Sequence, residues 1–222
     1  MVDKTLYAVI TGDIVDSSKA GKEQHALLFD TLKKAFSRIK STITAKDKPV
    51  SFDIYRGDSF QGFVPDPRAA LQASLTIRAS LRKAQPRNSS FSWDARTAIG
   101  LGTIDYLPEK ASEGDGEAYR RSGPYLDDMK TEQRLSIVSP WGEVNEEMQT
   151  EAALLDAVMA KWSPQQAEIV LELMEGKSRK TIGKAFGISQ AAVHYRVKGA
   201  GWFAVKSFID RYNAIVDARM NA

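Results

Sequence analysis

Two short acidic segments hold the residue types best suited to chemistry. Asp13 follows an apolar run that is typical of a buried strand, and Asp58 lies in the tight turn Arg56–Ser59 between two strand-like runs. Carboxylates at the ends of neighbouring strands are hard oxygen ligands of the kind that Mg²⁺ and Mn²⁺ prefer. We therefore expect Asp13 and Asp58 to hold one of these ions against the phosphates of a nucleotide.

The residues beside Asp58 suit the same task. Arg56 is a natural phosphate contact, and Gly57 lets the backbone of the turn approach a phosphate closely. Asp16 is either a third metal ligand or a cap for the turn that follows it. The alternative for Asp58 is that Arg-Gly-Asp-Ser merely suits a tight turn, and Asp13 could be an exposed loop acid. Their places on adjacent strands favour the metal site.

A second segment, Thr181–Arg196, has the spacing of a helix-turn-helix. Gly183 is small where two helices would cross, Gly187 allows the turn, and Val193 would hold the second helix in place. Ser189 is a candidate N-cap for that helix, which would bring its exposed start to DNA. We expect Gln190 and His194 to reach base edges. The residues expected in the DNA interface are Arg179, Lys180, Ser189, Gln190, His194, Tyr195, Arg196 and Lys198.

The distribution of charge supports this prediction. Residues 1–150 carry 21 basic and 21 acidic side chains, whereas the stretch from Gly176 to Ile209 has seven Lys or Arg residues and no acid. Such a local positive field suits a phosphate backbone, so Arg179, Lys180, Arg196 and Lys198 are expected on phosphates. The alternatives are an ordinary solvated helix face and a helical hairpin that binds no DNA.

The elements that position these residues change character along the chain. Before Gly142 the patterns predict the order β-α-β-β-α-β-α-β, which without its last strand is the split βαβ arrangement of ferredoxin-like and palm folds. After Gly142 only helical patterns remain, and Ser163 and Pro164 begin one of these helices. We predict an α+β chain with a nucleotide cyclase-like (palm) domain over 1–142 and an all-α helix-turn-helix domain over 143–222.

Composition excludes several classes of protein. The 222 residues include no cysteine, so the chain has no disulfide framework and no thiolate metal site. No apolar run approaches the length that spans a membrane, and the N-terminus lacks the pattern of a secretion signal. These features predict a cytoplasmic protein. Its net charge at pH 7 is +3.

The acidic motifs resemble those of two related enzyme groups. The segment Ile10–Ser18 looks like the first metal motif of class III nucleotide cyclases and diguanylate cyclases, and the hairpin around Asp58 looks like their second. A nearer resemblance is to the bacterial SatD family, which shares Gly12–Val15, Gly57–Gly62, Gly114–Tyr119 and a similar helix-turn-helix at its end. It covers nearly the whole chain, and the hairpin sextet is its most specific part.

The resemblance implies specific roles. It assigns metal binding to Asp13 and Asp58, with the carbonyl of Ile14 as a further ligand. The other roles of the cyclase site do not transfer directly, and Arg120 or Arg121 would substitute only with a different geometry. Gly116, Arg120 and Arg121 are therefore the further nucleotide or phosphate contacts that we expect. Ile54 stands where class III cyclases usually have a purine-selecting lysine. Pro124 stands where they have a transition-state arginine, and it cannot donate a hydrogen bond. These departures predict a ligand-binding domain without efficient cyclisation.

The resemblance as a whole implies a DNA-binding transcriptional regulator that senses a metal–nucleotide ligand. One alternative is a divergent metal-dependent nucleotidyl cyclase or nucleotide hydrolase that its helix-turn-helix merely localises. Another is an interaction module whose acidic pair is vestigial. A homodimer is plausible, because helix-turn-helix proteins read paired half-sites and class III cyclases build composite sites between subunits.

Overall fold

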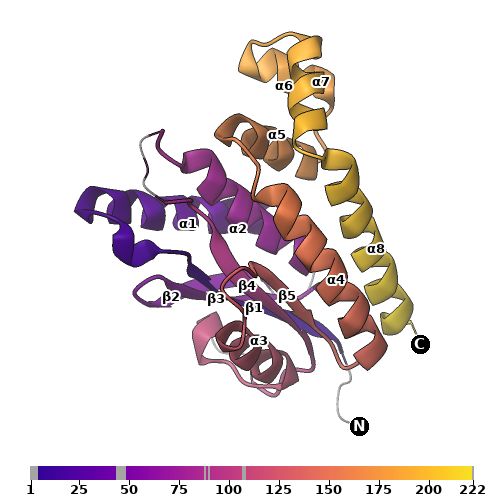
Figure 1. Ribbon diagram of the computed structural model, residues 1–222. Helices are drawn as coiled ribbons and strands as arrows, with labels where there is room; N and C mark the ends of the chain where they lie inside the picture. The colour runs from indigo at the N-terminus through magenta and orange to yellow at the C-terminus, as the bar shows by residue number, and fades with distance from the viewer. Residues whose placement is uncertain (1–4, 44–48, 88, 90, 107–108, 222) are drawn as a thin grey trace.

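The computed structural model describes residues 5–43, 49–87, 89, 91–106 and 109–221, and these form a five-stranded mixed sheet and eight α-helices (Figure 1). The strand order is β2-β3-β1-β4-β5. The strands are β1 (Tyr7–Ile14), β2 (Ser51–Arg56), β3 (Ser59–Val64), β4 (Ala95–Gly102) and β5 (Leu135–Val138). The chain is thus a mixed α+β protein, as predicted.

The sheet is antiparallel except at one edge. β1 lies between β3 and β4 and runs antiparallel to both, β2 and β3 form a hairpin, and β5 adds to β4 in parallel. The predicted order of strands and helices before Gly142 is confirmed. One boundary differs, because β1 continues to Ile14 and Asp13 therefore lies inside a strand rather than after it.

Helices cover both faces of the sheet. α1 (Lys22–Thr42) and α2 (Ala70–Ala84) lie on one face, and α3 (Glu117–Asp127) lies on the other (Figure 1). Successive strand residues point to opposite faces, and β1 follows this rule. Ile10 packs in the core under α1 and α2, Val9 packs against Ala118 of α3, and the Thr11 hydroxyl donates to Ser122 of α3 at 2.8 Å.

The C-terminal part of the chain is helical. It contains α4 (Gly142–Met159), α5 (Pro164–Met174), α6 (Arg179–Phe186), α7 (Gln190–Gly199) and α8 (Trp202–Met220). Ser163 caps α5 as predicted, in a reciprocal capping box with Gln166. α6 and α7 stand at the end of the molecule farthest from the sheet, and α8 returns from them along α4 (Figure 1).

One hydrophobic core links the sheet to the C-terminal helices. Ile99 of the sheet, Met148 of α4 and Tyr212 of α8 belong to the same cluster of buried side chains. A smaller cluster joins α5, α6 and α7 around Ile169, Ile182, Val193 and Val197. The domain boundary at 142/143 stays a prediction, and the main core extends across it.

A buried ionic network ties α2 to β4 and α4. The guanidinium of Arg78 is fully buried and lies 2.9 Å from Asp94 and 2.6 Å from Asp156. Arg82 also reaches Asp94, at 3.1 Å. Burial raises the pKa of Asp94, but the charge and hydrogen bonds of Arg78 outweigh burial, so this pKa stays below its ordinary value. The network fixes α4 against the start of β4.

No helix within the described ranges is both long enough and apolar enough to cross a lipid bilayer.

Candidate functional site

The structure brings the two predicted acids to the same corner of the sheet. Asp13 of β1 pairs across the strands with Ser59 of β3, directly after the turn that carries Asp58. The Ile14 amide donates to the Asp58 carbonyl at 3.3 Å, so the backbone of Ile14 faces this turn. The expectation that the two acids come from adjacent strands is confirmed.

An arginine binds one of the two acids that the sequence predicted to hold a metal ion. Arg96 of β4 is the cross-strand partner of Asp13, and its guanidinium donates to both carboxylate oxygens at 3.0 and 2.5 Å. The hydrogen bond to Asp13 raises the pKa of Arg96, and the charges of Asp127 and Asp58 raise it further. The Ser17 hydroxyl donates to Asp58. Asp13 therefore holds the guanidinium directly, and the negative charges of Asp58 and Asp127 lie near enough to act on it.

This arrangement limits what the corner can bind. No group of three or more His, Asp or Glu side chains in the described part of the chain is placed to hold a metal ion. Both carboxylate oxygens of Asp13 accept a hydrogen bond from Arg96, so an ion that used all the acceptor sites of Asp13 would have to displace this guanidinium. Asp16 forms an ion pair with Lys19 at 2.9 Å. The Mg²⁺ or Mn²⁺ site stays a prediction, and an ion there would have to share Asp13 with Arg96 or displace it.

The glycines of the hairpin have different roles. Gly57 occupies the turn with φ of 53°, where a side chain would be strained, and a Cβ there would meet no neighbour. Gly62 makes room for the Phe52 ring, which would lie 2.0 Å from an added Cβ. The two glycines of the hairpin are thus explained by the backbone turn and by the packing of Phe52, independently of any contact with phosphate. The side chain of Arg56 lies outside the described part of the structure.

The other predicted phosphate contacts lie at the opposite end of the sheet. Arg121 donates to the carbonyl of Leu101, which pairs with Ala8 at the start of β1, five residues before Asp13. Five strand residues span about 17 Å. Arg120 binds Asp105 and Asp115 at 2.9 and 2.8 Å. Neither arginine forms one site with Asp13 and Asp58.

Gly116 also lies at this far end, as the N-cap residue of α3. Its φ is 142°, and an added Cβ would lie 2.6 Å from the Cα of Ile104. The backbone contact explains the glycine without a ligand. The two residues that depart from the cyclase pattern fit structural roles as well, because Ile54 packs against the core and Pro124 lies within α3.

The second predicted site is built by α6 and α7. Gly187 has φ of 62° and ends α6, and the Ser189 hydroxyl accepts the amide of Ala192 at 3.1 Å and caps α7. A Cβ on Gly183 would lie 3.1 Å from the Ile188 carbonyl oxygen and 3.4 Å from Val193. The helices therefore cross closely at Gly183, as the spacing predicted.

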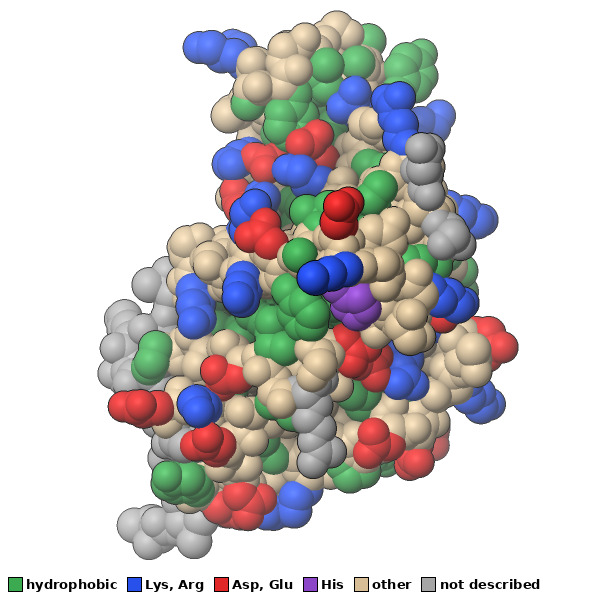
Figure 2. All heavy atoms as spheres, turned by 90° about the vertical axis from the view of Figure 1, so that its left-hand side faces the viewer, with side chains coloured by type: hydrophobic (Ala, Val, Ile, Leu, Met, Phe, Trp, Pro, Cys, Tyr) green, Lys and Arg blue, Asp and Glu red, His purple; other side chains and the backbone are tan. Residues whose placement is uncertain are grey.

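The basic side chains of this unit have no acidic partners among the described residues, and all but the half-buried Arg196 are exposed. In the described part of the chain, no acid pairs with any of Arg179, Lys180, Lys184, Arg196 and Lys198. Gln190 and His194 are exposed on α7, and Tyr195 is 71% exposed with its ring against His194. In Figure 2 the upper end of the molecule shows basic and hydrophobic side chains, and acidic ones appear below it.

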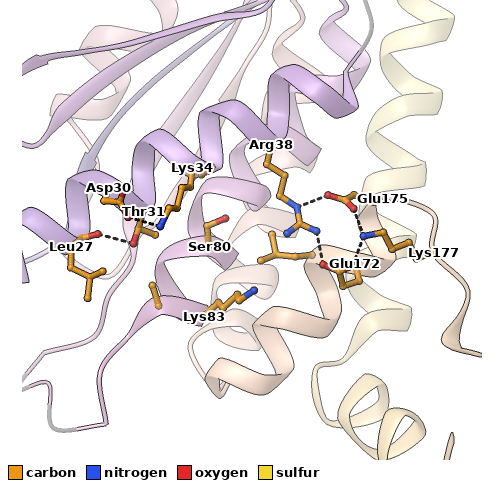
Figure 3. Close-up of a pocket in the computed structure, with 13 residues that line it drawn as sticks. Leu27, Asp30, Thr31, Lys34, Arg38, Ser80, Lys83, Glu172, Glu175 and Lys177 are labelled. Atoms are coloured by element: carbon orange, nitrogen blue, oxygen red, sulfur yellow. Dashed lines mark hydrogen bonds and ion pairs between the residues drawn. The ribbon is translucent and has the colours of Figure 1, made fainter. Parts of the chain in front are cut away.

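Two lysines of the predicted basic stretch are neutralised. Lys206 binds Asp210 at 2.6 Å, one helical turn away, and Lys177 binds Glu172 and Glu175 at 2.5 and 2.8 Å. Arg38 of α1 binds the same two glutamates, so the four residues fasten α1 to α5 beside a pocket of about 460 Å³ (Figure 3). The field over α6 and α7 comes from the other five basic residues.

Sequence reasoning missed two kinds of participant. Arg96 lies in the middle of a strand, 83 residues from Asp13, and only the strand register brings the two together. Ser17 follows Asp13 closely, but its hydroxyl needs the hairpin turn beside it. By contrast, the four-residue spacing of Lys206 and Asp210 on a helix could have indicated their pairing from the sequence.

Comparison of the chain with models of protein families finds no match, and comparison with curated protein sequences finds none either.

Proposed function

We propose that this protein is a DNA-binding transcriptional regulator that uses α6 and α7 as a helix-turn-helix. One observation carries the proposal: a glycine-closed turn joins two closely crossing helices whose five basic side chains, four exposed and Arg196 half-buried, have no acidic partner in the described part of the chain. A positive surface of this kind attracts the phosphate backbone, and the capped start of α7 suits the major groove.

The proposed roles follow from position. Gln190 and His194 lie in the first half of α7 and are exposed, so they are the candidates for base edges, with Tyr195 beside them. Arg196 and Lys198 in the last turn of α7, and Arg179 and Lys180 in the first turn of α6, would bind phosphates. Ser189 would act through its capping of α7.

Salt-dependent binding tests the proposal. Affinity for genomic DNA fragments should fall steeply with salt, and Arg196→Ala with Lys198→Ala should reduce the slope of log K against log salt by about 2. Lys206→Ala is the matched control, because Asp210 already neutralises Lys206, and its slope should equal that of the wild type. Absent binding, or equal slopes in all three proteins, would refute the proposal.

A second candidate function belongs to the sheet. The strand order, with α1 and α2 on one face, supports a ferredoxin-like, palm-type domain of the cyclase kind. Asp13 binds Arg96 directly and the charges of Asp58 and Asp127 act on it as well, and we propose that a metal–nucleotide ligand displaces its guanidinium from Asp13. Asp13, Asp58 and the Ile14 carbonyl would then hold the ion, and the freed Arg96 would face the phosphates. Arg120 and Arg121 lie too far away to take part.

Calorimetric titration with ATP and GTP, with and without Mg²⁺, tests this candidate. We expect heat only with the metal, and its loss in Asp13→Ala and Asp58→Ala, while Arg120→Ala keeps it. No heat with either nucleotide, or equal heat in the aspartate variants, would eliminate the site. Analysis of products after incubation then separates sensing from catalysis, since a divergent cyclase or hydrolase would change the nucleotide pool.

A further inference from the structure

The most exposed large hydrophobic side chain in the described part of the structure lies beside an empty hollow. Phe203, at the start of α8, is 87% exposed, and Leu154 of α4 is 66% exposed. Both line a groove of about 410 Å³ between α4 and α8 whose other apolar walls are Leu155, Val158, Ala204 and Phe208. We call these six residues the α4–α8 patch.

Single exposed hydrophobic residues are ordinary, but this patch differs from them in two respects. Its two most exposed members, Phe203 and Leu154, line the same hollow. A hydrophobic side chain that projects from the surface and a groove that could hold one therefore lie side by side. Its rim includes Glu151, one of whose carboxylate oxygens is buried and has no hydrogen-bond partner in the described part of the chain. An unpaired buried oxygen of this kind can accept a hydrogen bond from outside the chain, from a water or from a partner.

We propose that a second copy of this chain covers the α4–α8 patch in a twofold dimer. A twofold interface uses the same surface on both subunits, so it requires a surface complementary to itself. The patch meets this requirement because Phe203 can enter the hollow of the other copy while its own hollow receives the other Phe203. The rim carries Glu151 and Arg211, and Arg211 also binds Glu147 at 2.7 Å. In a twofold dimer the Arg211 of one copy would lie toward the Glu151 of the other, where opposite charges attract.

The position of the patch gives the dimer a consequence for DNA binding. α8 begins three residues after α7 ends, so Phe203 lies at the C-terminal end of α7. The ten residues of α7 span about 15 Å. Two such helices that extend from an axis near Phe203 would have their N-terminal ends up to about 30 Å apart. Paired half-sites on DNA are about 34 Å apart, so the helices would also have to stand a few ångströms off the axis to read a palindromic site.

Sedimentation and light scattering over a range of concentrations test the proposal directly. We expect the wild type to be a dimer, and Phe203→Glu and Leu154→Glu to be monomers with an unchanged circular dichroism spectrum. Tyr125→Glu is the control, because Tyr125 is also exposed (47%) but lies on α3, and it should remain a dimer. A monomeric wild type, or a dimer that survives both substitutions, would overturn the proposal.

The absence of cysteine allows a second test that does not depend on weakening the fold. Ser207→Cys introduces one thiol into the groove, and mild oxidation should link two chains covalently. Ala185→Cys on α6 is the control and should stay unlinked. Equal cross-linking of both variants would contradict the proposal. DNA binding by the monomeric Leu154→Glu variant is measured separately with unspecific fragments, because Leu154 lies on α4 away from the basic residues of α6 and α7. Failure of the dimer and failure of the helix-turn-helix proposal are then distinguishable.

Discussion

The corner formed by Asp13, Arg96 and Asp58 shows how one side chain decides what an acidic pair can do. Two carboxylates on neighbouring strands repel each other unless a cation lies between them. Arg96 supplies that cation from the chain itself, with two hydrogen bonds to Asp13. The charge of Asp13 is therefore balanced within the chain, and a cation that displaces this guanidinium would have to compete with its two hydrogen bonds.

The buried network around Asp94 gives the sharpest stability prediction at the level of single residues. Asp94→Asn keeps the size of the side chain but leaves the fully buried Arg78 with one carboxylate instead of two. Removing one partner of a buried ion pair costs about 3–5 kcal/mol. Urea unfolding should show a loss of this order, whereas Asp128→Asn on the surface should change little. A loss below about 1 kcal/mol would contradict the assignment.

The lowered pKa of Asp94 also predicts how the free energy of unfolding depends on pH. The pKa of Asp94 is lower in the folded protein than its ordinary value, so its contribution is complete above about pH 4, the pKa of an unfolded aspartate. It is lost as the pH falls through the folded-state pKa. Asp94→Asn should therefore lose less stability than the wild type between neutral and strongly acidic pH. Parallel stability curves for the two proteins would refute this.

At the level of elements, local signals were predictable and pairings between distant segments were not. The caps Ser163 and Ser189 and the turn at Gly187 follow from residue types within a few positions, so the sequence predicts them well. The ion pair of Asp13 with Arg96 depends on strand register, and that of Lys177 with Glu172 depends on how the loop after α5 folds back. Such contacts require the tertiary fold.

The crossing of α6 and α7 yields a prediction at this scale. Gly183→Val places a branched side chain against the Ile188 carbonyl and the Val193 side chain, where even a Cβ is tight. Overpacking of this kind costs about 1–3 kcal/mol and should separate the two helices. Ala185→Val changes an exposed position of the same helix and serves as the control. DNA affinity should fall in the first variant only, and equal affinities would contradict the helix crossing.

At the scale of the whole molecule, one hydrophobic core extends from the sheet into the C-terminal helices. Met148 and Leu155 of α4 pack in the same cluster as the sheet, and the Tyr212 hydroxyl of α8 donates to the Pro67 carbonyl at 2.8 Å. Arg38 and Lys177 share two glutamates at the junction of α1 and α5 (Figure 3). A ligand at the sheet could therefore move α6 and α7 in two ways. Either α4, α5 and α8 shift with them, or α6 and α7 turn about the segments that join them to α5 and α8.

This continuity predicts that the full chain unfolds as one unit. Trp93 belongs to the sheet region and Trp162 lies between α4 and α5, and both are buried in the same cluster. Fluorescence from variants that keep one or the other tryptophan should give coincident urea transitions. A fragment of residues 1–142 lacks α4, exposes the core face that Met148 covers, and should unfold at lower urea or aggregate. Two separate transitions, or a fragment as stable as the full chain, would show that the predicted domains fold independently.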